Sequence, residues 1–470
     1  MTMDLITQLS GILLSALHVT GVVLALHALN RPHSPQGTIA WMMGLTLMPL
    51  VVVPLYIILG AARIHRNTTS RHSRESIQAF LKLQGAWSAP VTELQRTLTR
   101  CTGYSPCEGN DITLLRDGND TYRDMLAAIR EARHFILVEF FIIRNDLVGE
   151  TLRRVLEERA HAGVQVYVIY DEVGSHKLPA GYLRHLRGAG VQVSSVNGRR
   201  FWLSSILRLN YRNHRKLVVI DGQLAYLGSL NIGLEYTKRP KATYWRDTFL
   251  ALRGPIVSQC QLSFSDDWKR ATGQNINDLA TPCPPVGPHN CQLLPSGPED
   301  GPMNTWQLTL LEMAAAARER LWLASPYFVP TAAVQAALCA AALRGVDVRI
   351  LVPKRSDNHT AGLALLTFIP PMLAAGVRML AYEPGFLHEK VCVVDSGLCS
   401  IGTANLDERS LRLNFELTLL MSGPSPTGAV ADMLVEDMAH ATPLTPAHWY
   451  KAPYAVRQLA NCCRLLAPAL

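Results

Sequence analysis

The sequence predicts an α/β protein of two tandem halves with similar folds, preceded by a helical hairpin that spans a membrane. Three observations indicate this: an apolar run over most of the first sixty positions, strands that alternate with helices after it, and internal repetition. The repetition is plainest in "GVQVYVI" at 163–169 and "GVDVRIL" at 345–351. Alternating strands and helices favour a mixed or largely parallel sheet with helices on its faces. A chain of 470 residues has room for two or three domains.

The first element is the hairpin, which we expect over residues 1–62. Leu9–Leu29 is almost uninterruptedly apolar, and a second apolar stretch runs from about Thr38 to Leu59. Each has the roughly 20 residues needed to cross about 30 Å of hydrocarbon. Pro49 and Pro54 are tolerable in a membrane helix. A cleaved signal peptide is the competing interpretation, but a basic n-region and an A-x-A site are missing and a second span follows directly.

Residues 63–110 are expected to form a basic connector next to the membrane. Four arginines follow the second apolar stretch, at positions 63, 66, 71 and 74, whereas the turn between the two stretches holds only Arg31. The positive-inside rule therefore places the bulk of the chain in the cytoplasm. The formal charge of +8 and the pI near 9.0 suit contact with anionic headgroups.

The two α/β halves are expected at 111–280 and 291–470, separated by the Pro-rich linker 281–290. Within each half, three apolar strands are each preceded by a helix that ends near a glycine or a charged turn. The expected strands are Phe135–Ile143, Val164–Tyr170 and Val191–Val196 in the first half, and Leu321–Ala324, Val346–Val352 and Val377–Ala381 in the second.

One segment of the first half has no clear counterpart in the second. Arg199–Leu209 reads RRFWLSSILRL, with basic residues beside Phe201 and Trp202. This composition suits the headgroup region of a membrane. Packing of the same apolar residues in the protein core is an equal alternative.

Cysteine usage favours neither a zinc site nor a disulfide framework. The ten cysteines form no CxxC pair, and Cys462 and Cys463 are adjacent. We expect reduced cysteines, as in a cytosolic domain.

The chemistry is carried by two copies of one motif. In both copies the offsets from the histidine are +2, +7, +14, +15 and +17, and the two histidines are 174 residues apart (388 − 214). The first copy is His214, Lys216, Asp221, Gly228, Ser229 and Asn231; the second is His388, Lys390, Asp395, Gly402, Thr403 and Asn405. Six positions repeated at matched spacing predict two half-sites that face one another.

These residue types suit transfer of a phosphoryl group. In a strand, residues i and i+2 point to the same face, so each histidine lies beside its lysine. The lysines bring positive charge to phosphate oxygens, and the hydroxyls and amides of Ser229, Asn231, Thr403 and Asn405 are candidate phosphate-binding groups. A neutral histidine can attack phosphorus while a protonated one gives the leaving alcohol its proton. This chemistry requires no metal or other cofactor.

The carboxylates of the motif have two interpretations. Asp221 and Asp395 belong to the expected catalytic set together with His214, Lys216, His388 and Lys390. Both aspartates sit at strand ends, where structural pairing is the favoured alternative to a direct role in phosphate chemistry.

The duplicated HxKxxxxD resembles the motif of the phospholipase D superfamily. Within that superfamily, the paired N-terminal spans, "LNYRNHRKLVVIDG", "FLHEKVCVVDSG", "GTANLDERS", "LNFE" and the terminal "RLLAPAL" resemble bacterial cardiolipin synthases. The resemblance implies a multi-pass protein of the bacterial inner membrane, with a cytoplasmic catalytic part. It also implies a two-step transfer through a phosphohistidine, in which one phosphatidylglycerol donates its phosphatidyl group, glycerol leaves, and a second phosphatidylglycerol accepts.

The resemblance also implies residue roles. His214 is assigned as nucleophile and His388 as general acid and then base, an order that the near symmetry of the motifs leaves open. Glu416 lies 28 residues after His388, where the family places a carboxylate that orients the histidine. Position 242, at the same offset from His214, is alanine, and Asp247 is the candidate there.

Several activities share this chemistry. A hydrolytic phospholipase D resolves the same intermediate with water, and a phosphatidylserine-type synthase, or one with phosphatidylethanolamine as donor, uses other lipids. A nuclease of the superfamily would suit a basic chain, but a membrane hairpin gives it no advantage, so nucleic acid is not an expected partner. Anionic membrane lipids are. The sequence leaves oligomeric state, acyl-chain preference and regulation open.

Overall fold

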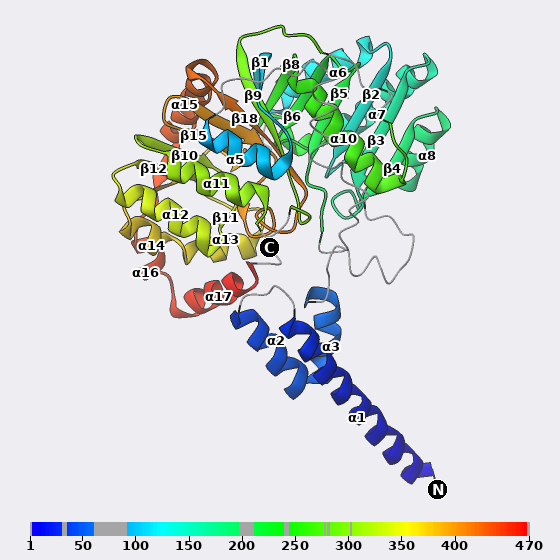
Figure 1. Cartoon of the computed structure of the whole chain (residues 1–470), viewed down its shortest axis with the longest axis vertical. Helices are drawn as coiled ribbons and strands as arrows, with labels where there is room; N and C mark the ends of the chain where they lie inside the picture. The colour runs from blue at the N-terminus through cyan, green and yellow to red at the C-terminus, as the bar shows by residue number, and fades with distance from the viewer. Residues whose placement is uncertain are drawn as a thin grey trace. The chain divides into compact units, whose positions relative to one another are not determined.

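The computed structural model describes residues 2–30, 35–60, 92–196, 211–238, 244–276, 279, 283–300 and 303–467. The described chain divides into two compact units, one formed by residues 2–30 and 35–60 and one formed by the described residues from 92 to 467 (Figure 1). The four arginines expected beside the membrane, Arg31 and the segment Arg199–Leu209 lie outside the described residues.

The N-terminal unit is helical and turns apolar side chains outward. Its elements are α1 (Thr2–Leu29), α2 (Pro35–Leu47), α3 (Pro49–Leu55) and the π-helical turn η1 (Tyr56–Gly60). Ala28, Leu45 and Tyr56 are fully buried between the helices, and His27 Nδ1 lies 3.0 Å from the Tyr56 hydroxyl. Leu13 and Leu50 remain more than 70% exposed. An outward apolar surface of this kind suits a hydrocarbon solvent.

Among the described residues, one helix is long and apolar enough to cross a membrane. It is Gly11–Leu29, with 19 residues and a mean hydropathy of 2.1. The second expected span does not form one continuous helix. The backbone leaves the helical region at Met48, with φ −133°, and α3 restarts at Pro49, which has no N–H to donate. Only 13 residues remain in α2, too few to cross a bilayer as a regular helix.

The larger unit is built on a single sheet of 15 strands that runs through both halves (Figure 1). The strand order is β19-β13-β12-β10-β15-β16-β18-β9-β1-β8-β6-β5-β2-β3-β4. In the first half the strands are β1 (Cys107–Arg116), β2 (Phe135–Phe140), β3 (Gln165–Asp171), β4 (Gln192–Val196), β5 (Lys216–Ile220), β6 (Leu224–Gly228) and β8 (Thr248–Arg253). In the second half they are β9 (His289–Ser296), β10 (Arg320–Ala324), β12 (Asp347–Pro353), β13 (Arg378–Tyr382), β15 (Val391–Val394), β16 (Leu398–Gly402), β18 (Glu416–Ser422) and β19 (Ala441–Pro443).

The order is symmetric about the antiparallel pair β1–β9, so β5 corresponds to β15 and β2 to β10. The outer strands β2-β3-β4 and β10-β12-β13 are parallel, and the other neighbours in this sheet are antiparallel. The sheet is therefore mixed, as predicted, and the six strands expected from the repeats are its parallel part. Two short pairs lie outside it: β11 (Phe328–Val329) with β17 (Leu406–Asp407), and β7 (Trp245–Arg246) with β14 (Phe386–Leu387).

Helices cover the sheet and join the halves through one core. The helices are α5 (Glu93–Thr102), α6 (Asp117–Glu131), α7 (Leu147–His161), α8 (Ala180–Gly188), the 3₁₀ turn η2 (Leu234–Tyr236), α10 (Ile256–Thr272), α11 (Thr305–Ala316), α12 (Ala332–Leu343), α13 (His359–Leu366), α14 (Ile369–Ala374), α15 (Pro424–Ala439), α16 (Ala447–Tyr450) and α17 (Tyr454–Leu465). Apolar residues of α10 and α15 share a buried cluster with Leu217 and Val219 of β5 and Val391 and Val393 of β15. One core therefore fixes the two motifs relative to each other.

Matching glycines show the duplication in the backbone. Gly163 follows α7 with φ +88°, and Gly345 follows α12 with φ +92°. This left-handed conformation ends a helix without strain only at glycine. In both halves a parallel strand, β3 or β12, begins two residues later. The expected domain limits, including the linker 281–290 that overlaps the start of β9, stay a prediction.

Candidate active site

Each motif histidine lies at the start of a central strand and pairs with a segment of the other half. His214 precedes β5, and its N–H donates to Phe415 O at 2.9 Å. His388 precedes β15, and its N–H donates to Arg246 O at 2.8 Å. The carbonyl acceptors come directly before Glu416 and Asp247, the two expected orienting carboxylates. The pairing therefore brings a carboxylate of one half to the histidine of the other.

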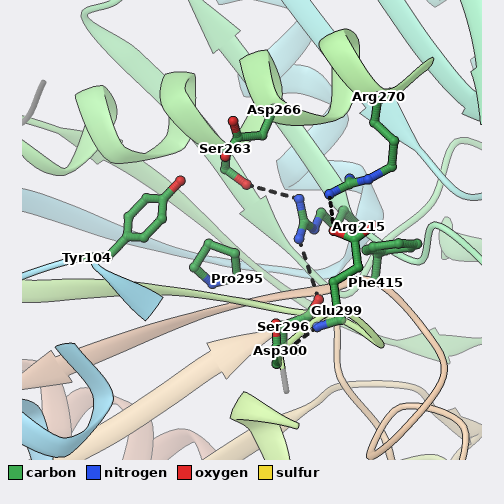
Figure 2. A pocket seen from close by; sticks show the side chains of 11 residues that line it. Tyr104, Arg215, Ser263, Asp266, Arg270, Pro295, Ser296, Glu299, Asp300 and Phe415 are labelled. Atoms are coloured by element: carbon green, nitrogen blue, oxygen red, sulfur yellow. Dashed lines mark hydrogen bonds and ion pairs between the residues drawn. The ribbon is translucent and has the colours of Figure 1, made fainter. Parts of the chain in front are cut away.

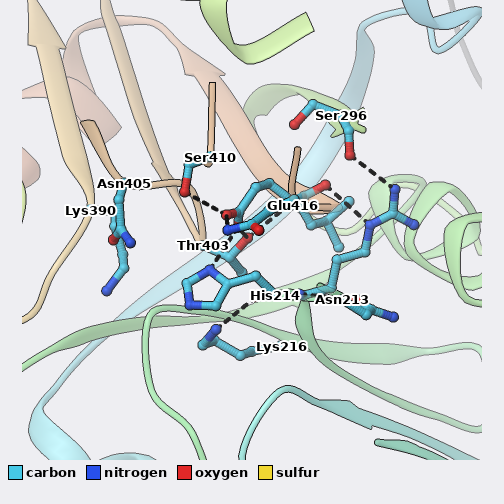
Figure 3. Close-up of polar contacts among 12 residues, drawn as sticks. Asn213, His214, Lys216, Ser296, Lys390, Thr403, Asn405, Ser410 and Glu416 are labelled. Atoms are coloured by element: carbon cyan, nitrogen blue, oxygen red, sulfur yellow. Dashed lines mark hydrogen bonds and ion pairs between the residues drawn. The ribbon is translucent and has the colours of Figure 1, made fainter. Parts of the chain in front are cut away.

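The two histidine–carboxylate pairs are crossed between the halves. His214 Nδ1 lies 2.9 Å from Glu416 Oε2 (Figure 3), and His388 Nδ1 lies 2.8 Å from Asp247 Oδ1. We expected Glu416 to serve His388 and Asp247 to serve His214, so this pairing corrects the expectation. With Nδ1–H donated to a carboxylate, Nε2 carries the lone pair and is the nitrogen available to a substrate.

Glu416 is held as a buried anion. Its side chain is fully buried and accepts hydrogen bonds from Thr403 Oγ1 at 2.6 Å, Ser410 Oγ at 2.7 Å and Asn414 Nδ2 at 3.3 Å (Figure 3). Burial alone would raise the pKa of Glu416, but His214, Lys216 and the hydrogen bond from Thr403 hold it below its usual value. Asp247 is also fully buried, and its pKa is likewise lowered by His388 and Lys390 against the effect of burial.

Burial keeps both imidazoles neutral at pH 7. It lowers the pKa of His214 to about 4, although Glu416 acts in the opposite direction. The pKa of His388 is also lowered by burial, with Asp247 opposing. Lys216 and Lys390 each lower the pKa of both histidines. Charges from both motifs thus act on each ring, which indicates one composite site.

The two lysines are buried and lie within range of each other's charge. Lys216 is completely buried and Lys390 is 4% exposed. Lys216 Nζ donates to His214 O at 2.6 Å, and Lys390 Nζ donates to His388 O. Burial lowers the pKa of Lys216 to about 7 and that of Lys390 to about 8. An anion bound between them would restore their full charge. Among the described residues, no three His, Cys, Asp or Glu side chains gather as metal ligands.

Asp221 and Asp395 take structural roles. Asp221 accepts the backbone N–H groups of residues 133–135 at 2.7–2.9 Å, and Asp395 accepts those of 318–320. Both adopt a positive φ, 52° and 50°, in the turn that ends the motif strand. Asp221 lies five residues beyond Lys216, about 16 Å along a strand. Their place in the expected catalytic set is therefore corrected, because their carboxylates are used to close turns.

The hydroxyls of the motifs support the orienting carboxylates. Ser229 Oγ donates to Thr248 O and accepts from Thr248 N, both at 3.0 Å, next to Asp247. Thr403 Oγ1 donates to Glu416 and accepts Leu417 N at 2.9 Å. Both hydroxyls are fully buried. This differs from the expected phosphate-binding role.

The two motif asparagines differ from each other. Asn231 Oδ1 accepts Ile142 N at 3.0 Å, and its Nδ2 donates to the Tyr236 hydroxyl at 2.8 Å. Asn405 is 4% exposed, and its buried Oδ1 has no hydrogen-bond partner among the described residues. This free oxygen is an acceptor and would suit a hydroxyl group rather than a phosphate oxygen, so a phosphate-binding role for Asn405 stays a prediction.

Comparisons with known proteins place this site in a family. The profile described as "Cardiolipin synthase, PLD-like domain" matches residues 125–268 and 310–440. Cardiolipin synthase A of Pseudomonas putida is 41% identical over 473 residues, covering 98% of both chains. The chain belongs to the cardiolipin synthase family of phospholipase D-like proteins.

Further relatives agree. Cardiolipin synthase A of Pseudomonas aeruginosa is 38% identical, with 99% of this chain and 97% of the relative covered. The crystal structure of phosphatidylserine synthase from Haemophilus influenzae Rd KW20 superposes with a TM-score of 0.60 over 84% of this chain and all of that one. At 14% identity this second likeness concerns the fold.

In this member of the cardiolipin synthase family, the residue between the histidine and the lysine of each motif, Arg215 or Glu389, forms buried structural contacts next to the site. Arg215 forms an ion pair with Asp267 of α10, and its Nε donates to Glu416 O at 3.1 Å. The cavity beside it in Figure 2 has a volume of only about 10 Å³, room for about one water molecule. On the other side, Glu389 accepts from Thr248 and lies 3.5 Å from Arg246. These contacts are structural, and apart from the Arg215–Asp267 pair they join the two halves.

Aromatic residues around His388 were missed at the level of sequence. The ring centroids of Trp245, Tyr236 and Phe386 lie 5.1, 5.8 and 5.8 Å from that of His388. Among the residues that the structure describes, His214 has one such neighbour, Phe141, at 5.0 Å. A signal was present for Trp245, since it precedes Asp247 by two positions and so shares its face in an extended segment.

Proposed function

We propose that this chain is a cardiolipin synthase that transfers a phosphatidyl group from one phosphatidylglycerol to another and releases glycerol. The observation that carries the proposal is the crossed pair His214–Glu416 and His388–Asp247 within one site of a cardiolipin synthase family member. Two oriented imidazoles beside two lysines are what double displacement at one phosphorus requires.

In the first step, Nε2 of His214 attacks the phosphorus of the donor lipid. A P–N bond forms, the P–O bond to the glycerol headgroup breaks, and His388 gives its proton to the departing oxygen. Lys216 and Lys390 neutralise the non-bridging oxygens. His388 must be protonated for this step; the anionic phosphodiester supplies the negative charge that raises its pKa on binding.

In the second step, the headgroup hydroxyl of another phosphatidylglycerol takes the place of glycerol. His388, now neutral, removes the hydroxyl proton; the oxygen attacks phosphorus and the P–N bond breaks. His214 is regenerated and cardiolipin leaves. One phosphodiester replaces another, so no nucleotide is consumed. Glu416 and Asp247 stabilise the positive charge that each imidazole carries during the cycle.

We further propose that the protein is embedded in the bacterial inner membrane with the catalytic unit in the cytoplasm. Helix α1 serves as one span, and α2, α3 and η1 return the chain as an interrupted second one, which makes the protein multi-pass. The basic residues 63–74 support this orientation. Phosphatidylglycerol and other anionic lipids are the partners, and nucleic acid is not. Protease digestion of sealed spheroplasts tests the topology, since cleavage of the catalytic unit from the periplasmic side would reverse it.

The deciding experiment supplies the purified full chain in proteoliposomes with phosphatidylglycerol labelled in its headgroup and acyl chains. Cardiolipin and free glycerol in equal amounts are expected. Phosphatidic acid as the main product would indicate a hydrolase. In parallel vesicles that also contain labelled phosphatidylethanolamine, transfer of that label would identify another donor. His214→Ala and His388→Ala are expected to abolish turnover, while EDTA leaves it unchanged. Phosphate trapped on His388 would reverse the assigned order.

A further inference from the structure

The C-terminal helix of the larger unit turns its large apolar side chains to solvent. Among the described residues of this unit, ten large hydrophobic side chains are exposed, and five of them fall within residues 450–466. These five are Tyr450 of α16, Tyr454, Leu459 and Leu465 of α17, and Leu466. Leu465 is 82% exposed and Tyr454 70%. A concentration of this kind on a soluble surface marks a binding site.

Helix α17 buries small side chains and exposes its large apolar ones, which is the opposite of an ordinary surface helix. Its buried residues are small, Ala460 at 0% and Cys463 at 6% exposure, and the helix packs on α13. At 3.6 residues per turn, Tyr454, Leu465, Leu466 and Leu459 fall on one outward arc of about 140°. A surface helix normally directs such an arc toward the core. The exposed apolar arc of α17 is therefore a candidate binding face.

The charged residues near α17 indicate what kind of partner contacts this face. No acidic residue occurs after Asp437, whereas Lys451, Arg457 and Arg464 lie in or beside the two helices. Tyrosines at the edge of an apolar face and basic residues beside it are typical of helices that lie in the headgroup region of an anionic bilayer. A second copy of the chain would place the same basic residues against each other. The composition therefore favours a lipid surface.

The element beneath α17 offers space for an apolar chain. Helix α13 packs against α17 and also contributes Leu365 and Leu366 to a cavity of about 290 Å³. Leu444 and His448, which precede α17, line the same cavity. Its lining is mostly apolar, which agrees with contact with lipid on this side of the second half.

We propose that α16 and α17 lie in the membrane interface, with Tyr454, Leu459, Leu465 and Leu466 immersed among acyl chains and the basic residues at the headgroups. The helix would hold the second half against the surface from which lipid substrates come. The inference rests on the proposed function for its choice of partner, but its test does not require turnover.

The chain supplies its own probe position. Of the ten cysteines, Cys462 is the exposed one, and it falls inside the outward arc. A nitroxide on Cys462 of the full chain, reconstituted in phosphatidylglycerol-containing vesicles, is expected to collide more often with oxygen than with a water-soluble nickel complex. The control label at Glu131→Cys in a Cys462→Ser background, on exposed α6, is expected to show the reverse preference. Equal nickel access at both positions would overturn the proposal.

A substitution separates lipid contact from general surface effects. Leu465→Glu is expected to lower about tenfold the ratio of membrane-inserted to water-exposed label at Cys462. A tenfold change corresponds to the free energy of burying about one leucine side chain. Leu343→Glu adds the same charge at a leucine that is 74% exposed on α12 and is expected to change nothing. Spin–spin broadening between labels of two copies would show a chain–chain interface and refute the lipid assignment. If the chain made no cardiolipin, the label depth would still be measured, so the two failures are distinguishable.

Discussion

Replacement of Glu416 by glutamine is the sharpest test of the crossed site. The change keeps the shape of the side chain and removes one buried negative charge 2.9 Å from His214 Nδ1. In the wild type, Glu416 opposes the burial that lowers the pKa of His214 to about 4. Without that charge the pKa of His214 falls further, and the amide no longer fixes which ring nitrogen carries the proton.

The magnitude follows from the burial of the pair. The side chains of Glu416 and His214 are 0% and 10% exposed, so solvent screens the interaction little. Loss of one partner from a buried ion pair costs about 3–5 kcal/mol. At 1.36 kcal/mol per factor of ten, and with the imidazole charged only during the reaction, kcat falls about 10²- to 10⁴-fold.

The assay is turnover of labelled phosphatidylglycerol in proteoliposomes, together with thermal unfolding of each variant. Glu436→Gln is the matched control, because this glutamate belongs to the same half and its side chain is 64% exposed. We expect the control to stay within about twofold of the wild type. If folded Glu416→Gln kept more than about a tenth of wild-type kcat, a gain of less than 1.4 kcal/mol from Glu416, the reasoning would be refuted.

Three further outcomes are expected. Asp221→Ala removes a carboxylate that accepts three backbone N–H groups and places alanine at φ 52°, so it should lower the free energy of unfolding by about 2–4 kcal/mol. The kcat per folded molecule should change little. A large loss of kcat at unchanged stability would restore Asp221 to the catalytic set. Lys216→Met should abolish turnover yet raise the unfolding temperature at pH 7. The pKa of the buried lysine is lowered to about 7, so the unfolded chain binds this proton more tightly and the lysine destabilises the fold. A lower unfolding temperature for the variant would contradict this. The unfolding temperature should fall as the pH drops from 6.5 to 4, because His214 and His388 have lowered pKa values in the fold and take up protons more readily in the unfolded chain. Glu416 and Asp247, whose folded pKa values are also lowered, lose their stabilising contribution only at lower pH, below their ordinary values of 4.5 and 3.8. Calorimetry across this range, with a His214→Gln/His388→Gln variant as the reference of shallower slope, measures it.

Local patterns predicted local structure well. The Gly-Val repeats at 163 and 345 mark the places where a helix ends and a parallel strand starts, and all six strands expected from such patterns are present. The central strands that carry the histidines are antiparallel hairpins, which a pattern of alternating strands and helices does not describe. The second apolar stretch is helical but interrupted at Met48, which a hydropathy pattern does not predict because it takes no account of the missing N–H of Pro49.

What sequence could not supply was pairing across the molecule. Glu416 and Asp247 were both recognised, but each was matched to the histidine nearest in sequence. Their true partners are set by the meeting of β7 with β14 and of Phe415 with Asn213, segments 141 to 202 residues apart. The sequence likewise predicts a ligand role for Ser229 and Thr403, because only the fold shows that the hydroxyls of both residues are already hydrogen-bonded to neighbouring backbone.

The exchange of carboxylates has a consequence for how such a protein arises and how it fails. Neither copy of the repeat holds a complete set of its own, so an ancestor with one copy would have needed two polypeptides lying face to face. In the fused chain, a damaging mutation in one copy can impair two histidines. It affects the histidine of that copy directly, and it affects the histidine of the other copy because the mutated copy supplies the carboxylate that orients it. Selection therefore acts on the two repeats as a single unit.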